Sequence, residues 1–281
     1  LPHDADGNLT AFIEKGVWKM TASYSHDNLV TAVKTSGKTT TVSYDAMRFP
    51  RKMASGGVTT YLYYDHKGRL LFETDEAGNP IINYVYRGKR LVASQTADGE
   101  VCFYHHSRNG NTLAVTSQDG SILNAYAYTA HGEVIAKEES TGNRFTFLGA
   151  FGAIRFDDKY ILTGARVYNT HMGRYIQRDP LGMITGTNPY LYASNNPVSG
   201  IDPLGLDDEN ETVNSQALDP SSDNDYSTAG GTANPYADGL PYRGNDWDTY
   251  GSALSNTVND FFNHPVSDFI PDAVGNPVAF A

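Results

Sequence analysis

The sequence predicts an all-β protein built around an antiparallel sheet, and three observations carry that prediction. Tyrosines recur every 20 residues in the first part of the chain, at Tyr24, Tyr44, Tyr64, Tyr84 and Tyr104. Glycines mark expected turns 10–12 residues apart, at Gly68, Gly78, Gly88, Gly99, Gly110, Gly120, Gly132 and Gly142. No apolar period of about 3.6 residues, which would predict amphipathic helices, appears before residue 207. Short strands between evenly spaced turns are typical of a meandering antiparallel sheet.

The fullest copy of the repeat is residues 61–86, YLYYDHKGRLLFETDEAGNPIINYVY. Two turns are expected in it, Asp65-x-x-Gly68 and Asp75-x-x-Gly78. The aspartate caps such a turn with its side chain, and the glycine takes the positive φ that the turn requires. The segments between and after these turns have the length and the β-branched, aromatic composition of strands.

The tyrosines are expected to form an aromatic ladder across the sheet. A single hairpin cannot bury its own face, so successive repeats must pair edge to edge. Tyrosines in register on neighbouring strands would then pack against one another. A stacking surface for sugars is the functional alternative for such a ladder.

Charge divides the chain into a neutral body and an acidic tail. Residues 1–206 carry 20 Lys and Arg against 19 Asp and Glu, whereas residues 207–281 carry one basic residue against 13 acids. Neither part offers the basic stripe that phosphate contacts need, so no nucleic-acid partner is expected. The tail is rich in Asp, Asn, Ser, Gly and Pro, which predicts a mostly irregular segment with a short helix after Asp248.

The sequence contains no residue pattern that predicts a metal site or a cofactor site. Cys102 is the single cysteine, which excludes an internal disulfide, and its neighbours His105 and His106 have no second ligand cluster to complete a metal site. No nucleophile elbow or phosphate-binding glycine loop is present, so no cofactor is expected. No apolar run approaches the ~18 residues of a membrane span. Because the chain starts at Leu1 and shows no export signal, we expect a fragment or a processed form.

The repeats resemble those of a known family. TyrTyrAspHisLysGlyArgLeu at residues 63–70 is similar to the tyrosine-aspartate (YD) repeat of bacterial Rhs proteins. From about Tyr104 the chain resembles the Rhs repeat-associated core, above all in GARVYNTHMGRYIQRDPLG (164–182) and NPYLYASNNPVSGIDPLGL (188–206). The resemblance covers roughly residues 40–206.

The resemblance implies a fold and a role. Rhs and toxin-complex proteins wind their repeats into a hollow β-shell that the core closes, and the chain beyond the core is a variable toxin held inside. This implies YD-repeat hairpins over 1–103, an Rhs core over 104–206 and a variable acidic tail over 207–281. The tail would be a linker or a truncated cargo. A cognate immunity or delivery protein would be a further partner, and the protein would be secreted or lie at the cell surface. The alternative is a cell-surface repeat protein whose tyrosine face binds glycans or another protein.

The family resemblance also implies self-cleavage by aspartates after the DPxGL motif, which places the cut here between Leu206 and Asp207. Asp179 and Asp202 are the only carboxylates between Lys159 and Leu206. Two neighbouring carboxyl groups can divide the work of peptide hydrolysis, one activating water and the other protonating the leaving amide. The reaction needs one turnover only, because the bond is tethered beside the acids.

Arg178 is the guanidinium that we expect to orient this pair. The alternative is that both aspartates only begin Asp-Pro turns. Two positions depart from the family pattern: Asn169 replaces an aspartate, and Leu191 leaves the NPYLY segment without an acid. If the partner acid came from that segment, this copy would not cut itself.

Overall fold

The computed structural model describes residues 1–35, 37–164, 166–180 and 188–206. The described chain is almost entirely β-structure, and its two helical elements are single 3-10 turns, η1 (Gly149–Phe151) and η3 (Ala193–Asn195). The prediction of an all-β antiparallel fold is therefore confirmed. The acidic tail and the helix predicted in it lie outside the described residues.

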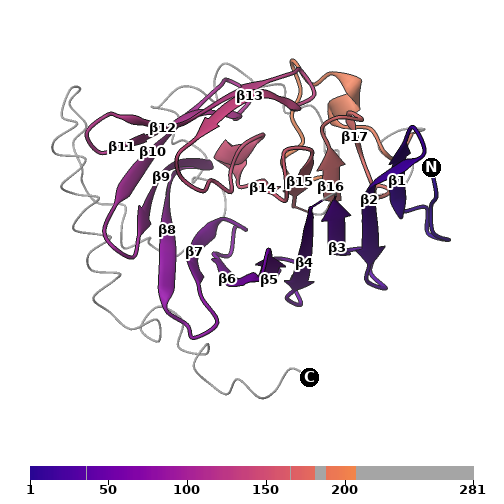
Figure 1. Ribbon diagram of the computed structural model, residues 1–281, viewed down its shortest axis with the longest axis horizontal. Coiled ribbons are helices and arrows are strands. Elements are labelled where there is room, and N and C mark those ends of the chain that lie inside the picture. Colours follow the sequence, from indigo (N-terminus) through magenta and orange to yellow (C-terminus); the bar gives the residue numbers. More distant parts are fainter. Residues whose placement is uncertain (36, 165, 181–187, 207–281) are drawn as a thin grey trace, which may run out of the picture. The chain divides into compact units, whose positions relative to one another are not determined.

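The main element is a 13-stranded antiparallel sheet in which each strand pairs with its neighbours in sequence (Figure 1). This order follows from tight turns between consecutive strands, and the sheet is not closed. It continues without a break across residue 103, from β1 to β13. The strands are β1 (Ala11–Glu14), β2 (Val17–Tyr24), β3 (Val30–Thr35), β4 (Lys38–Tyr44), β5 (Pro50–Ser55), β6 (Val58–Tyr64), β7 (Leu70–Thr74), β8 (Pro80–Arg87), β9 (Arg90–Thr96), β10 (Val101–His106), β11 (Thr112–Ser117), β12 (Ile122–Tyr128) and β13 (Val134–Glu139).

The tyrosine repeat marks a β-bulge at the end of every second strand. The pairing register shifts just before Tyr24, Tyr44 and Tyr64, and again before Tyr86, His106 and Tyr128. The predicted period is therefore wrong at Tyr84 and Tyr104, which lie two residues before the bulge position. The reason is turn length: Gly56 and Gly57 alone join β5 to β6, whereas Asp75–Asn79 joins β7 to β8.

The repeat tyrosines do not form the expected ladder on neighbouring strands, because a repeat of two strands places them on alternate ones. Instead their rings pack against the core, and several hydroxyls reach back to the preceding hairpin. Tyr24 donates to the carbonyl of Leu9 at 2.6 Å, and Tyr44 donates to that of Val30 at 2.9 Å. Burial raises the pKa of both phenols, so they remain donors. Tyr24 and Tyr44 are thus clips between hairpins, whereas the buried hydroxyl of Tyr64 has no hydrogen-bond partner among the described residues.

The residue after the bulge caps the turn that follows it. Asp65 Oδ1 accepts the backbone N–H groups of Lys67 and Arg69, both at 2.9 Å, and its Oδ2 accepts the Arg69 Nε at 2.7 Å. Asp45 caps the previous copy in the same way. A hydroxyl replaces the carboxylate in three other copies, those of Ser25, Ser107 and Thr129. The YD dipeptide is therefore a bulge followed by a capped turn.

Replacing Asp65 with alanine is expected to lower the free energy of unfolding by roughly 1–2 kcal/mol at pH 7, because two backbone donors lose their acceptor. Partial burial opposes ionisation of this carboxyl, but its hydrogen bonds outweigh that effect and hold its pKa below the ordinary value. The stabilisation is therefore complete above the unfolded pKa and is lost as the pH falls through the lowered folded one. Urea titrations at pH 7 and below pH 4 would test this. Asp65→Asn, which keeps an acceptor, should cost less, and equal losses at both pH values would contradict the assignment.

A second, four-stranded antiparallel sheet packs against the inner face of the large one (Figure 1). It consists of β14 (Ile154–Arg155), β15 (Tyr160–Thr163), β16 (Arg166–Asn169) and β17 (Arg174–Tyr175). The main hydrophobic core joins the two sheets, with Met20, Val42 and Leu62 on one side and Leu162 and Val167 on the other. The small sheet thereby receives a fixed position within residues 1–206.

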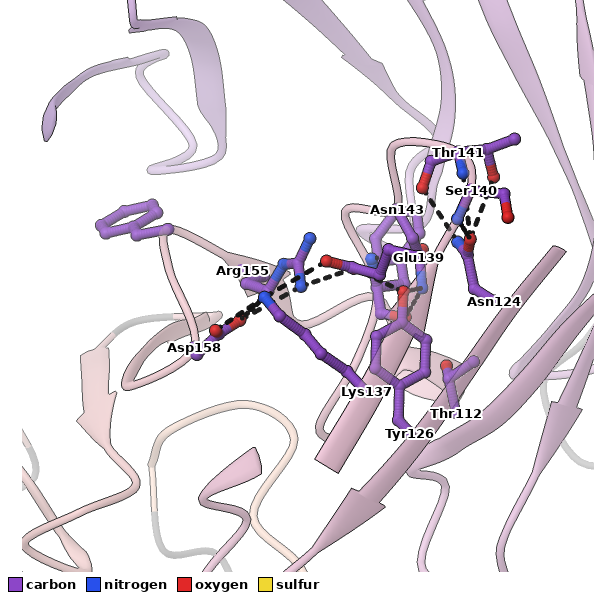
Figure 2. A network of polar contacts seen from close by, with 12 residues as sticks. Thr112, Asn124, Tyr126, Lys137, Glu139, Ser140, Thr141, Asn143, Arg155 and Asp158 are labelled. Atoms are coloured by element: carbon purple, nitrogen blue, oxygen red, sulfur yellow. Dashed lines mark hydrogen bonds and ion pairs between the residues drawn. The ribbon is translucent and has the colours of Figure 1, made fainter. Parts of the chain in front are cut away.

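A polar network connects the last strand of the large sheet to the small sheet (Figure 2). Lys137 pairs with Asp158 at 2.7 Å, and Arg155 pairs with Glu139 at 2.7 Å. Tyr126 donates to Glu139 at 2.6 Å from the neighbouring strand β12. These contacts join β13 to the small sheet. They therefore fix the two ends of the loop, residues 140–153, that leads from the large sheet to the small one.

Candidate active site

Arg166 is a buried cation at the beginning of strand β16. All eight residues of the hairpin strands β15 and β16 are buried, and the Arg166 side chain is 1% exposed. A charge held this far from water requires partners that replace its hydration. The surroundings of its guanidinium therefore define a specific polar site inside the core.

The Arg166 guanidinium joins the two predicted aspartates. Its Nη2 lies 3.0 Å from Asp179 Oδ2 and 3.2 Å from Asp202 Oδ2. The Nε donates to the carbonyl of Gly205, and Nη1 donates to that of Pro189 at 3.2 Å. Both carboxylates are themselves buried, at 5% exposure. One planar cation thus holds two acids together with the backbone that follows the second acid.

The loop after Asp202 turns back onto that same carboxylate. The backbone N–H of Leu206 donates to Asp202 Oδ1 at 3.1 Å. A hydrogen bond from residue i+4 to an aspartate is also what a turn-capping role would produce. The contact places the Leu206 backbone beside the acids, while Asp207 lies outside the described residues.

Two glycines allow this loop to lie close to the β15–β16 hairpin. Gly205 has a φ of +65°, and a Cβ there would lie 2.6 Å from Thr163 Oγ1. A Cβ on Gly164 would lie 2.6 Å from the carbonyl oxygen of Leu204. Side chains at either position would push the Leu206 backbone away from Asp202.

Tyr175 completes the shell around Asp202. Its hydroxyl donates to Asp202 Oδ2 at 2.8 Å, and the guanidinium of Arg166 lies 3.8 Å from the centre of its ring. Burial raises the pKa of this phenol well above its usual value, and the negative charge of Asp202 raises it further. Tyr175 therefore serves as a protonated donor that fixes one oxygen of the carboxylate.

An open pocket of about 460 Å³ reaches the other carboxylate. Arg166, Gln177 and Asp179 line it from the small-sheet side, and Asp27 and Asn28 line it from a turn of the large sheet. Asp179 borders this pocket, and its side chain is 1% exposed. Asp202 is enclosed by Tyr175, Arg166 and its own loop. The two acids thus have different surroundings, which is a feature of acid–base pairs.

Arg178 does not take part in this cluster. Its side chain is exposed and lies over the backbone of Gly7, where a Cβ would meet its Cδ at 2.5 Å. The guanidinium that contacts both aspartates is that of Arg166, which was not predicted from the sequence, and not that of Arg178. A signal was present, since Arg166 opens the strand Arg166–Asn169 directly before two apolar residues, where a charge must be either solvated or paired. Strand β17 ends at Tyr175, three residues before Arg178.

Cys102, His105 and His106, which the sequence brought up as metal or thiol candidates, lie on strand β10 of the large sheet. The described residues contain no cluster of three or more His, Cys, Asp or Glu side chains with the geometry for a metal ion. Cys102 is half-buried, and burial raises the pKa of its thiol. His106 occupies the repeat-tyrosine position of β10, and burial lowers its pKa to about 4. These residues belong to the sheet.

Solved structures and curated proteins identify the class of this protein. The chain superposes on the crystal structure of TcdB2-TccC3 with a TM-score of 0.55 at 16% identity, covering 73% of this chain and 11% of that one. The fold is that of toxin-complex shell proteins. No protein-family model matches the chain. In the described part of the chain, no helix has the length and apolar character needed to cross a membrane.

The sequence relatives narrow the class further. The chain is 30% identical over 212 residues to the tRNA3(Ser)-specific nuclease WapA of Bacillus spizizenii, which covers 72% of this chain and 8% of WapA. It is 32% identical over 131 residues to the probable deoxyribonuclease RhsA of Dickeya dadantii, which covers 44% of this chain and 9% of RhsA. These relatives point to the Rhs/YD-repeat polymorphic toxin family, and the chain spans less than a tenth of either one.

Proposed function

We propose that this chain is the shell and core segment of an Rhs-type toxin protein, and that it cuts itself between Leu206 and Asp207. The observation that supports the cut is the convergence of Asp179 and Asp202 on Arg166, with the Leu206 N–H on Asp202. Two buried carboxyl groups beside the backbone of Leu206 support hydrolysis of the bond that follows this residue.

The proposed reaction divides the roles by access. Asp179, which lines the open pocket, takes a proton from a water molecule as the water oxygen attacks the carbonyl carbon of Leu206. The pair of carboxyl groups enters the step with one shared proton, and Asp202 passes that proton to the Asp207 nitrogen as the C–N bond breaks. The products are a Leu206 carboxylic acid and a free amine at Asp207, and Asp179 ends protonated. Arg166 and Tyr175 hold the carboxyl oxygens in place throughout.

The large sheet supports the proposal that this chain forms part of a shell. Residues 11–139 form one continuous wall of thirteen strands, and its two outermost strands, β1 and β13, each pair on one side within the described residues. We propose that YD-repeat hairpins (1–103) and the core (104–206) form part of an encapsulating shell, and that residues from 207 onward are its cargo. A cognate immunity or delivery protein would be a further partner. Secretion fits this role, because toxin is the class to which the relatives point.

Intact-mass measurement of the purified full chain tests the cut directly. The wild type is expected to yield a fragment ending at Leu206, and Asp179→Asn and Asp202→Asn are each expected to stay whole. Glu138→Gln, an exposed carboxylate on β13, is the matched control and should cut normally. Acid lysis of Asp-Pro bonds would instead give fragments ending at Asp179, Asp202 or Asp219. A folded wild type that stays whole would reject self-cleavage and leave the shell role alone.

A further inference from the structure

Gln177 connects the candidate active site to the large sheet. Its side chain is buried at 2% exposure and makes one hydrogen bond in each direction. The Oε1 accepts the backbone N–H of Val167 at 2.7 Å, and the Nε2 donates to the backbone carbonyl of Asn28 at 3.1 Å. Val167 directly follows Arg166, whereas Asn28 lies 149 residues before Gln177. One amide therefore joins the strand that carries the buried cation to a turn between β2 and β3.

The contact to Val167 replaces part of a β-ladder. The N–H of Ile176 donates to the Val167 carbonyl at 2.9 Å, as expected for paired strands. The N–H of Val167 is taken by the Gln177 side chain instead of a backbone carbonyl, which is why β17 ends at Tyr175. The start of β16, and with it the direction of the Arg166 side chain, thus depends on a side-chain amide.

The turn on the other side is itself held by the N-terminal segment. Asn28 has a φ of +61°, and its Oδ1 accepts the Nδ2 of Asn8 at 2.8 Å. Asn8 is 1% exposed and also donates to Asp4 Oδ2 at 3.0 Å. Gln177 therefore contacts the β2–β3 turn, and the position of that turn depends on its packing against the preceding turn, which contains Asp4 and Asn8.

Two more contacts link the same regions in parallel. The N–H of Leu9 donates to the carbonyl of Ile176 at 2.7 Å, next to Gln177. The hydroxyl of Tyr190 donates to the carbonyl of Gly7 at 2.7 Å, and Tyr190 directly follows Pro189, whose carbonyl accepts from both Arg166 and Asp179. The site is thus attached to the turns of the shell on two sides.

We propose that Gln177 is a positioning residue that makes cleavage depend on the docking of the β2–β3 turn. This inference rests on the proposed self-cleavage. With the turn in place, Gln177 holds Val167 so that Arg166 reaches both carboxylates. Without it, the start of β16 is free to shift, and a displacement of about 1 Å of a reacting group can slow a reaction ~100-fold. The chain would then be cut only after this part of the shell has packed against the core.

The test compares variants of the full chain by the rate of appearance of the fragment ending at Leu206. Gln177→Met keeps the volume but loses both hydrogen bonds, and is expected to cut at least about tenfold more slowly. Gln95→Met makes the same change at a similarly buried position on β9 and should cut at the wild-type rate. Asn28→Gly keeps the positive φ but loses the bond to Asn8, and a several-fold slowing is expected. An unchanged rate in Gln177→Met or Asn28→Gly overturns the proposal.

Two further measurements complete the test. The pH dependence of cleavage distinguishes a positioning role of Gln177 from a loss of stability, and hydrogen exchange tests the role of Gln177 independently of the proposed cut. The pH dependence of cleavage should change in Gln177→Met, since Arg166 no longer holds both acids at fixed distances, whereas general destabilisation would scale the rate equally at every pH. Hydrogen exchange at the Leu206 amide, which donates to Asp202, should become faster in Gln177→Met and not in Gln95→Met. Exchange can be measured even if the wild type stays whole, so failure of the cut does not conceal the outcome. Unchanged exchange at Leu206 overturns the coupling.

Discussion

Replacement of Arg166 with methionine is expected to abolish detectable self-cleavage. Arg166 is the cation that contacts both Asp179 and Asp202, through a single Nη2 at 3.0 and 3.2 Å. Without it, two buried carboxylates repel each other, and the Gly205 carbonyl loses the donor that holds the loop. Removing one partner of a buried ion pair also costs about 3–5 kcal/mol of stability.

Two further variants separate the chemistry from the folding. Arg166→Lys keeps the positive charge, but a single ammonium cannot reproduce the planar fork that reaches two acids and two carbonyls, so cutting should remain strongly impaired. The double variant Arg166→Met with Asp202→Asn removes one negative charge together with the cation. It should regain much of the stability in a urea titration while remaining uncut. Cleavage at the wild-type rate in Arg166→Lys would show that charge alone is required.

Replacement of Arg144 with methionine is expected to destabilise the fold by about 3–5 kcal/mol, the largest effect that we expect outside the site. Glu73 on β7 is 2% exposed, and Arg144 approaches it with two nitrogens, Nε at 2.8 Å and Nη2 at 2.7 Å. Tyr84 donates to the same carboxylate at 2.7 Å. Loss of Arg144 would leave a buried charge with one neutral donor.

Replacement of Glu73 should cost less stability than replacement of Arg144, because the two side chains differ in exposure. The Arg144 side chain is 22% exposed and can recover some hydration, whereas that of Glu73 is 3% exposed. Glu73→Gln is therefore expected to lower the free energy of unfolding by less than Arg144→Met. The double variant Glu73→Gln with Arg144→Met should lie closer to the wild type than Arg144→Met alone. Urea denaturation of the four proteins forms a double-mutant cycle, and additive losses would contradict a direct interaction.

The repeat could be predicted because its causes are local. A turn that needs a capping Asp and a positive-φ Gly shows in the spacing of those residues, and two such spacings are visible around Asp65 and Asp75. The detailed register could not be predicted in the same way. Tyr84 and Tyr104 fit the period by number, yet the longer turn at 75–79 moves the bulge position to Tyr86 and His106.

The two acids of the candidate site could be named because the family resemblance implies aspartates, and Asp179 and Asp202 are the carboxylates available between Lys159 and Leu206. Their cation could not be found that way. Arg178 is adjacent to Asp179 in sequence, but successive side chains in extended backbone point to opposite sides, and Arg178 lies exposed over Gly7. Arg166 reaches the acids from a different strand.

The sequence by itself therefore determined the all-β class and the capped turns, since each depends on residues close together in the chain. The tertiary structure decided which guanidinium joins those acids, that Gln177 contacts a turn 149 residues away, and that the repeat tyrosines face the core. The physical reason is the same in each case. A buried charge or amide takes whichever partner the packing of the two sheets brings within hydrogen-bond distance, and that packing depends on the whole chain.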